Sequence, residues 1–135
     1  MQAILDTGPW VAFIDRSENR HAEAVKWLKE FTGTLYSTEA VLTEVLYLLS
    51  FSIVAQCAAM DFVLESVVKI VPSDNESIKK TKGLMRKYAS LPMDYADGTL
   101  VALAIDTGIR TIVTFDRRDF GIYALPNRKK LILAI

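Results

Sequence analysis

Short apolar runs alternate with longer segments of helical periodicity along the whole chain. Each apolar run ends at a polar or turn-forming residue, a pattern that predicts β-strands. We expect strands over residues 2–6, 34–37, 68–71, 110–115 and 131–135.

Between these strands, apolar residues recur every three or four positions, which predicts amphipathic helices. Capping residues limit several of them: Ser37 or Thr38 is a good N-cap, Pro92 ends one helix, and Gly108 supplies a left-handed stop. We expect helices over residues 10–16, 17–31, 38–51, 53–65, 73–91 and 92–108, and a polar turn over residues 116–121.

This order of elements predicts an α/β fold. Short strands that alternate with helices of ten or more residues are typical of βα units, in which helices cover both faces of a parallel sheet. No repeat, low-complexity tract or linker interrupts the 135 residues, so we expect a single domain over residues 1–135. A chain of this size buries about two-thirds of its extended surface.

The amino-acid composition excludes fewer classes of function than the pattern of apolar and polar positions does. The 16 basic and 16 acidic residues cancel, so a polyanion must be met by a local patch or a metal ion. The lone Cys57 excludes an intrachain disulfide and, with no signal-like start, predicts a cytoplasmic protein. No apolar stretch reaches the roughly 18 residues of a membrane helix. We expect Cys57 in the core and His21 on an exposed helix surface.

The tripeptide Asp-Thr-Gly occurs twice, at Asp6 and at Asp106, which raises the possibility of an aspartic protease. Such a protease is an all-β protein whose two loops bring their carboxylates together. This chain is mostly helical by pattern, and its second copy ends a helix at Gly108. The pattern therefore argues against a protease, and we interpret Asp106 as part of a helix stop.

Several acids fall where a parallel sheet places its ligands, beyond the carboxyl ends of the strands. Asp6 ends the first strand, and Asp116 follows the strand over residues 110–115. Glu44 lies inside an apolar helix, where an unpaired buried carboxylate costs several kcal/mol. Asp94 and Asp97 share one face of a helix start. Singly, Asp6, Asp94 and Asp116 could be only turn or cap residues.

Taken together, these carboxylates would repel one another unless divalent ions neutralised them. Oxygen ligands favour Mg²⁺ or Mn²⁺ over zinc, and such sites hydrolyse phosphodiesters. Two other acid-based folds fit less well. A haloacid dehalogenase needs a second Asp where Gly8 stands, and a response-regulator receiver needs paired acids and a late Lys that are missing.

Four segments in this order resemble PIN-domain proteins, specifically the VapC-type ribonuclease toxins of toxin–antitoxin systems. They are "ILDTGPWVAFID", "STEAVLTEVLYLL", "LMRKYASLPMDYADGTLVALA" and "TIVTFDRRDF". The resemblance implies a three-layer α/β/α sandwich and Mg²⁺- or Mn²⁺-dependent endonucleolytic cleavage of RNA. Gly98 and Trp10 depart from the pattern: Gly98 could loosen its helix by up to about 1 kcal/mol, and Trp10 is larger than the usual aliphatic residue.

The resemblance also assigns roles to individual residues. It implies an acidic catalytic metal site of four residues, Asp6, Glu44, Asp97 and Asp116, with Thr114 supporting the site and Asp94 and Asp119 as accessory ligands. Either Asp6 or Asp97 would act as the base. Arg117 and Arg118, which lie beside Asp116, are the preferred candidates for RNA contact, while we interpret the basic segment over residues 79–87 as a solvated face in preference to an RNA-binding surface.

The expected partners follow from the same resemblance. VapC-type toxins dimerise and are inhibited by a small antitoxin, and the apolar segment over residues 46–64 could supply such a surface or belong to the core. The alternative function is a non-catalytic RNA- or protein-binding module of the same fold.

Overall fold

The computed structural model describes all 135 residues. Its centre is a sheet of five parallel strands in the order β3-β2-β1-β4-β5. Each strand lies within its predicted range. The strands are β1 (Gln2–Leu5), β2 (Thr34–Ser37), β3 (Val68–Ile70), β4 (Thr111–Val113) and β5 (Ile132–Ala134).

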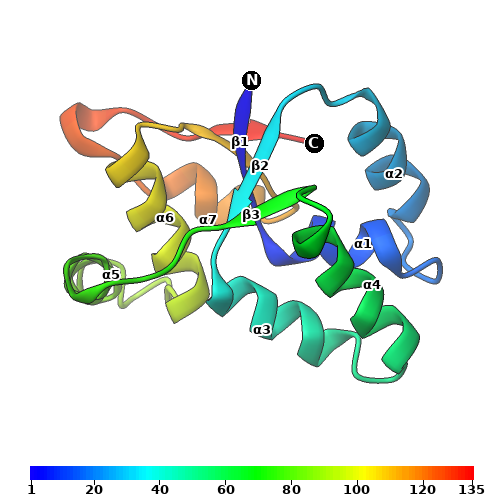
Figure 1. The fold of residues 1–135 in the computed structure, drawn as a ribbon. Helices are drawn as coiled ribbons and strands as arrows, with labels where there is room; N and C mark the ends of the chain where they lie inside the picture. Colours follow the sequence, from blue (N-terminus) through cyan, green and yellow to red (C-terminus); the bar gives the residue numbers. More distant parts are fainter.

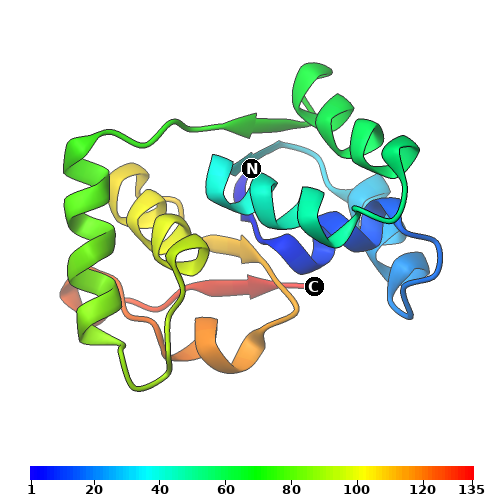
Figure 2. The same cartoon turned by 90° about the horizontal axis from the view of Figure 1, so that it is seen from below.

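Helices cover both faces of this sheet, so the predicted three-layer α/β/α fold is confirmed. Figures 1 and 2 show α1, α2 and α4 on one side and α5, α6 and α7 on the other, with α3 packed against α1, α4 and α6. No helix is both long and apolar enough to cross a membrane. The helices are α1 (Thr7–Ile14), α2 (His21–Glu30), α3 (Glu39–Leu48), α4 (Ile53–Leu64), α5 (Asn75–Lys87), α6 (Tyr95–Thr107), α7 (Arg117–Ile122) and the 3₁₀ turn η1 (Pro126–Arg128).

The chain path creates a crevice at one edge of the sheet. From β1 the chain proceeds to β2 and β3 on one side, then returns through α5 and α6 to β4 on the other side of β1. In such a sheet the crevice lies beyond the carboxyl ends of the two strands where the order reverses. The ends of β1 and β4, and the residues that follow them, therefore face a common site.

Capping explains where several helices begin and end. The Thr38 hydroxyl accepts a hydrogen bond from the Val41 amide, and α6 ends at Gly108 with a left-handed φ of 76°. Asp106, in the last turn of α6, forms an ion pair with Lys80 of α5. The second Asp-Thr-Gly is therefore a helix end, and its carboxylate already has a cationic partner.

The prediction of a polar turn over residues 116–121 is wrong. The segment forms the short helix α7, because the Asp116 side chain accepts a hydrogen bond from the Asp119 amide (3.0 Å) and Phe120 is fully buried. Likewise, α1 starts at Thr7 and includes Pro9 in its first turn. The first amides of a helix have no intrahelical acceptor, so proline costs nothing there.

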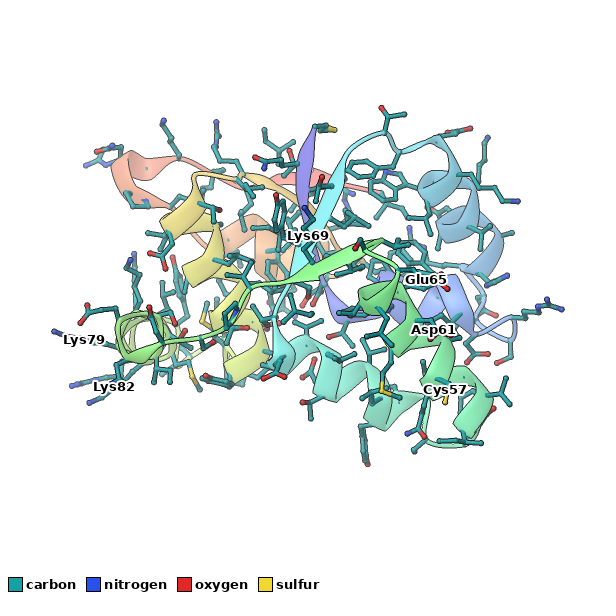
Figure 3. All side chains as sticks on the ribbon, in the orientation of Figure 1. Cys57, Asp61, Glu65, Lys69, Lys79 and Lys82 are labelled. Atoms are coloured by element: carbon teal, nitrogen blue, oxygen red, sulfur yellow. The ribbon has the colours of Figure 1, made fainter.

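Two expectations about single residues are also wrong. Cys57 is exposed, because α4 buries only Ala59 and directs Cys57 outward, as Figure 3 shows. His21 is partly buried, and its Nδ1 lies 2.6 Å from the carbonyl oxygen of Ala12 at the end of α1.

Gly98 permits the close approach of α5 and α6. A Cβ added to Gly98 would lie 2.8 Å from Cγ2 of the buried Thr81. We expect Gly98→Ala to lower the free energy of unfolding by about 1–2 kcal/mol, because the clash outweighs a helix-propensity gain of about 1 kcal/mol. Gly98 thus packs the helix pair and does not merely loosen α6.

Urea denaturation measures this effect. The control is Thr81→Ser, which deletes the clashing methyl group and keeps the hydroxyl that donates to the Ser77 carbonyl (2.9 Å). Gly98→Ala should cost less in the Thr81→Ser background than in the parent protein. Equal costs in the two backgrounds would show that the contact with Thr81 is not the cause.

Candidate active site

Asp6 lies at the carboxyl end of β1, where the strand order reverses. It follows β1, is only 8% exposed, and donates its amide hydrogen to the Val113 carbonyl of β4 (3.0 Å). Its Oδ2 accepts a hydrogen bond from the Thr114 hydroxyl (2.7 Å), and the same hydroxyl oxygen accepts from the Asp116 amide (3.0 Å). Thr114 therefore fixes both the Asp6 side chain and the backbone that carries Asp116.

Glu44 enters the site from α3. Its Oε1 accepts a hydrogen bond from the Thr7 hydroxyl at the start of α1 (2.7 Å), and its side chain is partly exposed. Burial raises the pKa of Glu44, and the neighbouring Asp94 carboxylate raises it further, against the effect of the Thr7 hydrogen bond. A carboxylate on an apolar helix is thus placed between a hydroxyl donor and a second acid.

Asp94 and Asp97 come from the beginning of α6. Asp94 is the N-cap and accepts a hydrogen bond from the Asp97 amide (2.8 Å), and Asp97 is the third helical residue. Asp97 Oδ2 accepts a hydrogen bond from the Tyr123 hydroxyl (3.3 Å). Burial of Tyr123 raises the pKa of that phenol, and the neighbouring Asp97 carboxylate raises it further.

The acids carry no compensating cation. The two ion pairs of the structure, Arg20–Glu23 and Lys80–Asp106, involve none of them. Burial and neighbouring carboxylates raise the pKa of Asp6 to about 6, against the Thr114 hydrogen bond. Burial, with the charges of Asp94, Asp6 and Asp116, raises the pKa of Asp97 to about 7. Asp6 and Asp116 therefore lie within electrostatic range of Asp97.

The remaining predicted residues lie at the margin of this group. The Asp119 amide donates a hydrogen bond to the Asp116 side chain. Beyond the burial of Tyr123, the charge of the Asp119 carboxylate helps to raise the pKa of the Tyr123 phenol. Arg117 donates to the carbonyl oxygen of Ile135 (3.1 Å), while Arg118 is exposed and forms no ion pair. Neither arginine contacts a site carboxylate.

Comparison with known proteins agrees with this architecture. The family model described as PIN domain matches residues 3–124. The chain belongs to the PIN domain family. This PIN-domain chain is also 26% identical, over 120 residues, to Ribonuclease VapC26 of Mycobacterium tuberculosis (strain ATCC 25618 / H37Rv), covering 87% of this chain and 89% of that protein. The predicted resemblance to VapC-type PIN proteins is thereby confirmed.

Solved structures of other PIN-domain proteins share the fold. Mycobacterium tuberculosis VapC20, described as a sarcin–ricin loop cleaving toxin, matches with a TM-score of 0.79 and 20% identity over 86% of this chain and 91% of that chain. Rickettsia felis VapBC2, bound to a DNA fragment from its promoter, matches with a TM-score of 0.65 and 21% identity over 99% and 98%.

The donor set of this PIN domain fits a hydrated hard cation. No three Asp, Glu, His or Cys side chains converge into a ready-made ion cage. Mg²⁺ does not require one, because it keeps several water ligands and is usually bound through one or two carboxylates. The site acids offer only oxygen donors, the pKa values of Asp6 and Asp97 are raised, and no cation lies beside them. A bound divalent ion would supply the missing positive charge.

Two residues of the site were missed by the sequence analysis. The Thr7 hydroxyl donates a hydrogen bond to Glu44, and the Tyr123 hydroxyl donates one to Asp97. Thr7 gave a weak signal because it directly follows Asp6. Tyr123 gave none, since only the tertiary fold brings this residue, which directly follows α7, within hydrogen-bonding distance of Asp97 of α6, 26 positions earlier.

The double role of Thr114 predicts a large effect of an isosteric change. Thr114→Val removes a donor to Asp6 and an acceptor for the Asp116 amide at a side chain that is 0% exposed. We expect the free energy of unfolding to fall by about 1–3 kcal/mol and the pKa of Asp6 to rise further. Chemical denaturation measures the first effect, with Thr114→Ser as the control that keeps the hydroxyl. If serine costs as much as valine, the hydrogen bonds are not the cause.

Proposed function

We propose that this protein is a divalent-metal-dependent endoribonuclease, acting as the toxin of a toxin–antitoxin pair. The observation that carries the proposal is the group of carboxylates at the ends of β1 and β4 and at the start of α6, in which Asp6 and Asp97 have raised pKa values and no cation lies beside them. A phosphodiester would bring further negative charge to this crevice, so the site can act on RNA only with a bound metal.

In this proposal Asp6, Glu44, Asp97 and Asp116 hold Mg²⁺ or Mn²⁺, with Asp94 and Asp119 as accessory acids. When bound, the ion activates water and stabilises charge on the phosphate oxygens. Thr114 and Thr7 hold the Asp6 and Glu44 carboxylates in fixed orientations. Asp97 is the more accessible of the two candidate bases, so we assign it to take the proton of the attacking water. Arg117 and Arg118 would contact RNA.

We also propose that an antitoxin and a second copy of this chain bind to exposed apolar side chains of α3, α4 and the loop between them. The side chains of Tyr47, Phe51 and Val54 are 76%, 68% and 77% exposed. Exposed apolar side chains that gather on one surface mark an interaction site. The solved VapBC2 of Rickettsia felis, which shares this fold, supports a protein partner.

Incubation of the purified protein with single-stranded RNA tests the activity. We expect endonucleolytic products with Mg²⁺ or Mn²⁺, none with EDTA, and none from a DNA of the same sequence. RNA that is bound but stays intact in either metal would contradict the proposal and favour the non-catalytic binding module.

A further inference from the structure

The helix α5 concentrates positive charge on a chain that is neutral overall. Five of the 16 basic residues lie within its 13 residues, with only one of the 16 acids, Glu76. All five cations are exposed. Lys80 pairs with Asp106 of α6, so four cations have no anionic partner in the structure. We call these four the α5 basic surface: Lys79, Lys82, Arg86 and Lys87.

Three of these cations form a single ridge. Lys79, Lys82 and Arg86 are three and four residues apart, so they share one face of the helix with rises of about 4.5 and 6 Å between them. Figure 3 shows Lys79 and Lys82 pointing away from the body of the molecule. Gly83 lies on the same face and leaves open space where a Cβ would stand. The backbone of a ligand can therefore approach the helix closely between the charges.

The α5 basic surface is connected to the candidate active site. The ring of Tyr88, which directly follows α5, packs on Tyr123 with centroids 5.0 Å apart, and the Tyr123 hydroxyl donates to Asp97. The carboxyl end of α5 thus adjoins the residues that line the crevice. Figures 1 and 2 show that α5 lies across the outer side of α6.

The chemistry of this surface favours the phosphodiester backbone of a nucleic acid over a protein. Protein interfaces are depleted in lysine and rely on aromatic and other large apolar anchors. The ridge offers cations, a glycine and no aromatic side chain. A single-stranded nucleic acid presents one charge per nucleotide at spacings that cations three and four residues apart can follow.

We propose that α5 binds the part of the RNA substrate that flanks the cleaved bond, with Lys79, Lys82 and Arg86 contacting successive phosphates. The proposal rests on the proposed ribonuclease function. It gives the acidic crevice, which repels RNA, a neighbouring surface that holds the strand without reading its sequence.

Binding of a fluorescent single-stranded RNA, measured by anisotropy in metal-free buffer, tests this. The parent protein for the experiment carries Asp97→Asn, which prevents cleavage. We expect the triple variant Lys79→Gln, Lys82→Gln and Arg86→Gln to bind about 10- to 50-fold more weakly at physiological salt. The slope of log affinity against log salt should fall by about 2, as expected for three lost phosphate contacts.

The matched control removes three exposed lysines from elsewhere: Lys26 and Lys29 of α2 and Lys69 of β3. It should keep both the affinity and the salt slope of the parent. A charge-preserving variant, Lys79→Arg, Lys82→Arg and Arg86→Lys, should bind as the parent does, and circular dichroism checks that each variant folds.

Equal losses in the α5 variant and the α2–β3 control would overturn the proposal, because net charge alone would then explain binding. Unchanged RNA binding by the α5 variant, together with lost binding of a polyglutamate peptide, would assign the surface to an acidic protein instead. Cleavage assays on the protein without the Asp97 change are independent: a lowered salt slope without any cleavage would contradict the ribonuclease and leave the RNA-binding surface standing.

Discussion

Asp97→Asn is expected to abolish RNA cleavage and, at the same time, to stabilise the protein. The amide keeps an acceptor for the Tyr123 hydroxyl but cannot take a proton or hold a divalent ion as a carboxylate does. Metal-ion catalysis contributes several kcal/mol, so the rate should fall on the order of 10³-fold or more. Asp6→Asn should have an effect of the same size.

The stability change has the opposite sign because the charged Asp97 is unfavourable in the folded state. Burial and the Asp94, Asp6 and Asp116 charges raise its pKa to about 7. Asparagine removes that cost wherever Asp97 would be ionised. After allowance for partial exposure, we expect the free energy of unfolding at about pH 8 to rise by about 1–2 kcal/mol.

Initial cleavage rates and urea denaturation measure the two effects in the same preparations. The control is Asp61→Asn, which changes an exposed carboxylate on α4, remote from the crevice (Figure 3). It should leave both quantities unchanged. An Asp97→Asn protein that cleaves RNA at the parent rate would refute the assignment of Asp97.

The stability of the metal-free protein should decrease as the pH rises from about 4 to 8. Asp6 and Asp97 have pKa values of about 6 and 7 in the folded protein, against the ordinary aspartate value of 3.8. Across this window the folded state binds more protons than the unfolded state, so the free energy of unfolding falls with increasing pH. The shift at Asp6 alone corresponds to about 3 kcal/mol, and we expect a total of this order.

A divalent ion should reverse this trend. It competes with protons for the same carboxylates, so Mg²⁺ or Mn²⁺ should bind more tightly, and raise the melting temperature more, at about pH 8 than at about pH 5. Thermal denaturation with and without metal at both pH values provides the measurement.

The double variant Asp6→Asn and Asp97→Asn serves as the control, since it should lose both the pH dependence and the stabilisation by metal. A metal effect of equal size in the double variant would place the ion elsewhere. A parent protein whose stability increases between about pH 4 and 8 would contradict the raised pKa values.

Much of the fold followed from local sequence patterns. The five strands and the caps at Thr38 and Gly108 depend on residues close together in the chain, which periodicity and capping rules describe well. The predictions for α7 and for the burial of Cys57 were wrong for a different reason. Whether a short polar segment becomes a helix, or which side of α4 is buried, depends on what the rest of the molecule packs against it.

The same division applies to the candidate site. The sequence by itself determined which acids end strands or begin helices and that Glu44 lies on an apolar helix, and the resemblance to PIN domains grouped these acids into one site. Only the tertiary structure decided which groups meet: Thr7 with Glu44, Tyr123 with Asp97, and Thr114 with Asp6 across 108 positions. It also left four of the five α5 cations without an anionic partner. The reason is physical: caps and periodicity act over a few residues, whereas these contacts and the raised pKa values depend on how helices pack on the sheet and how much water they exclude.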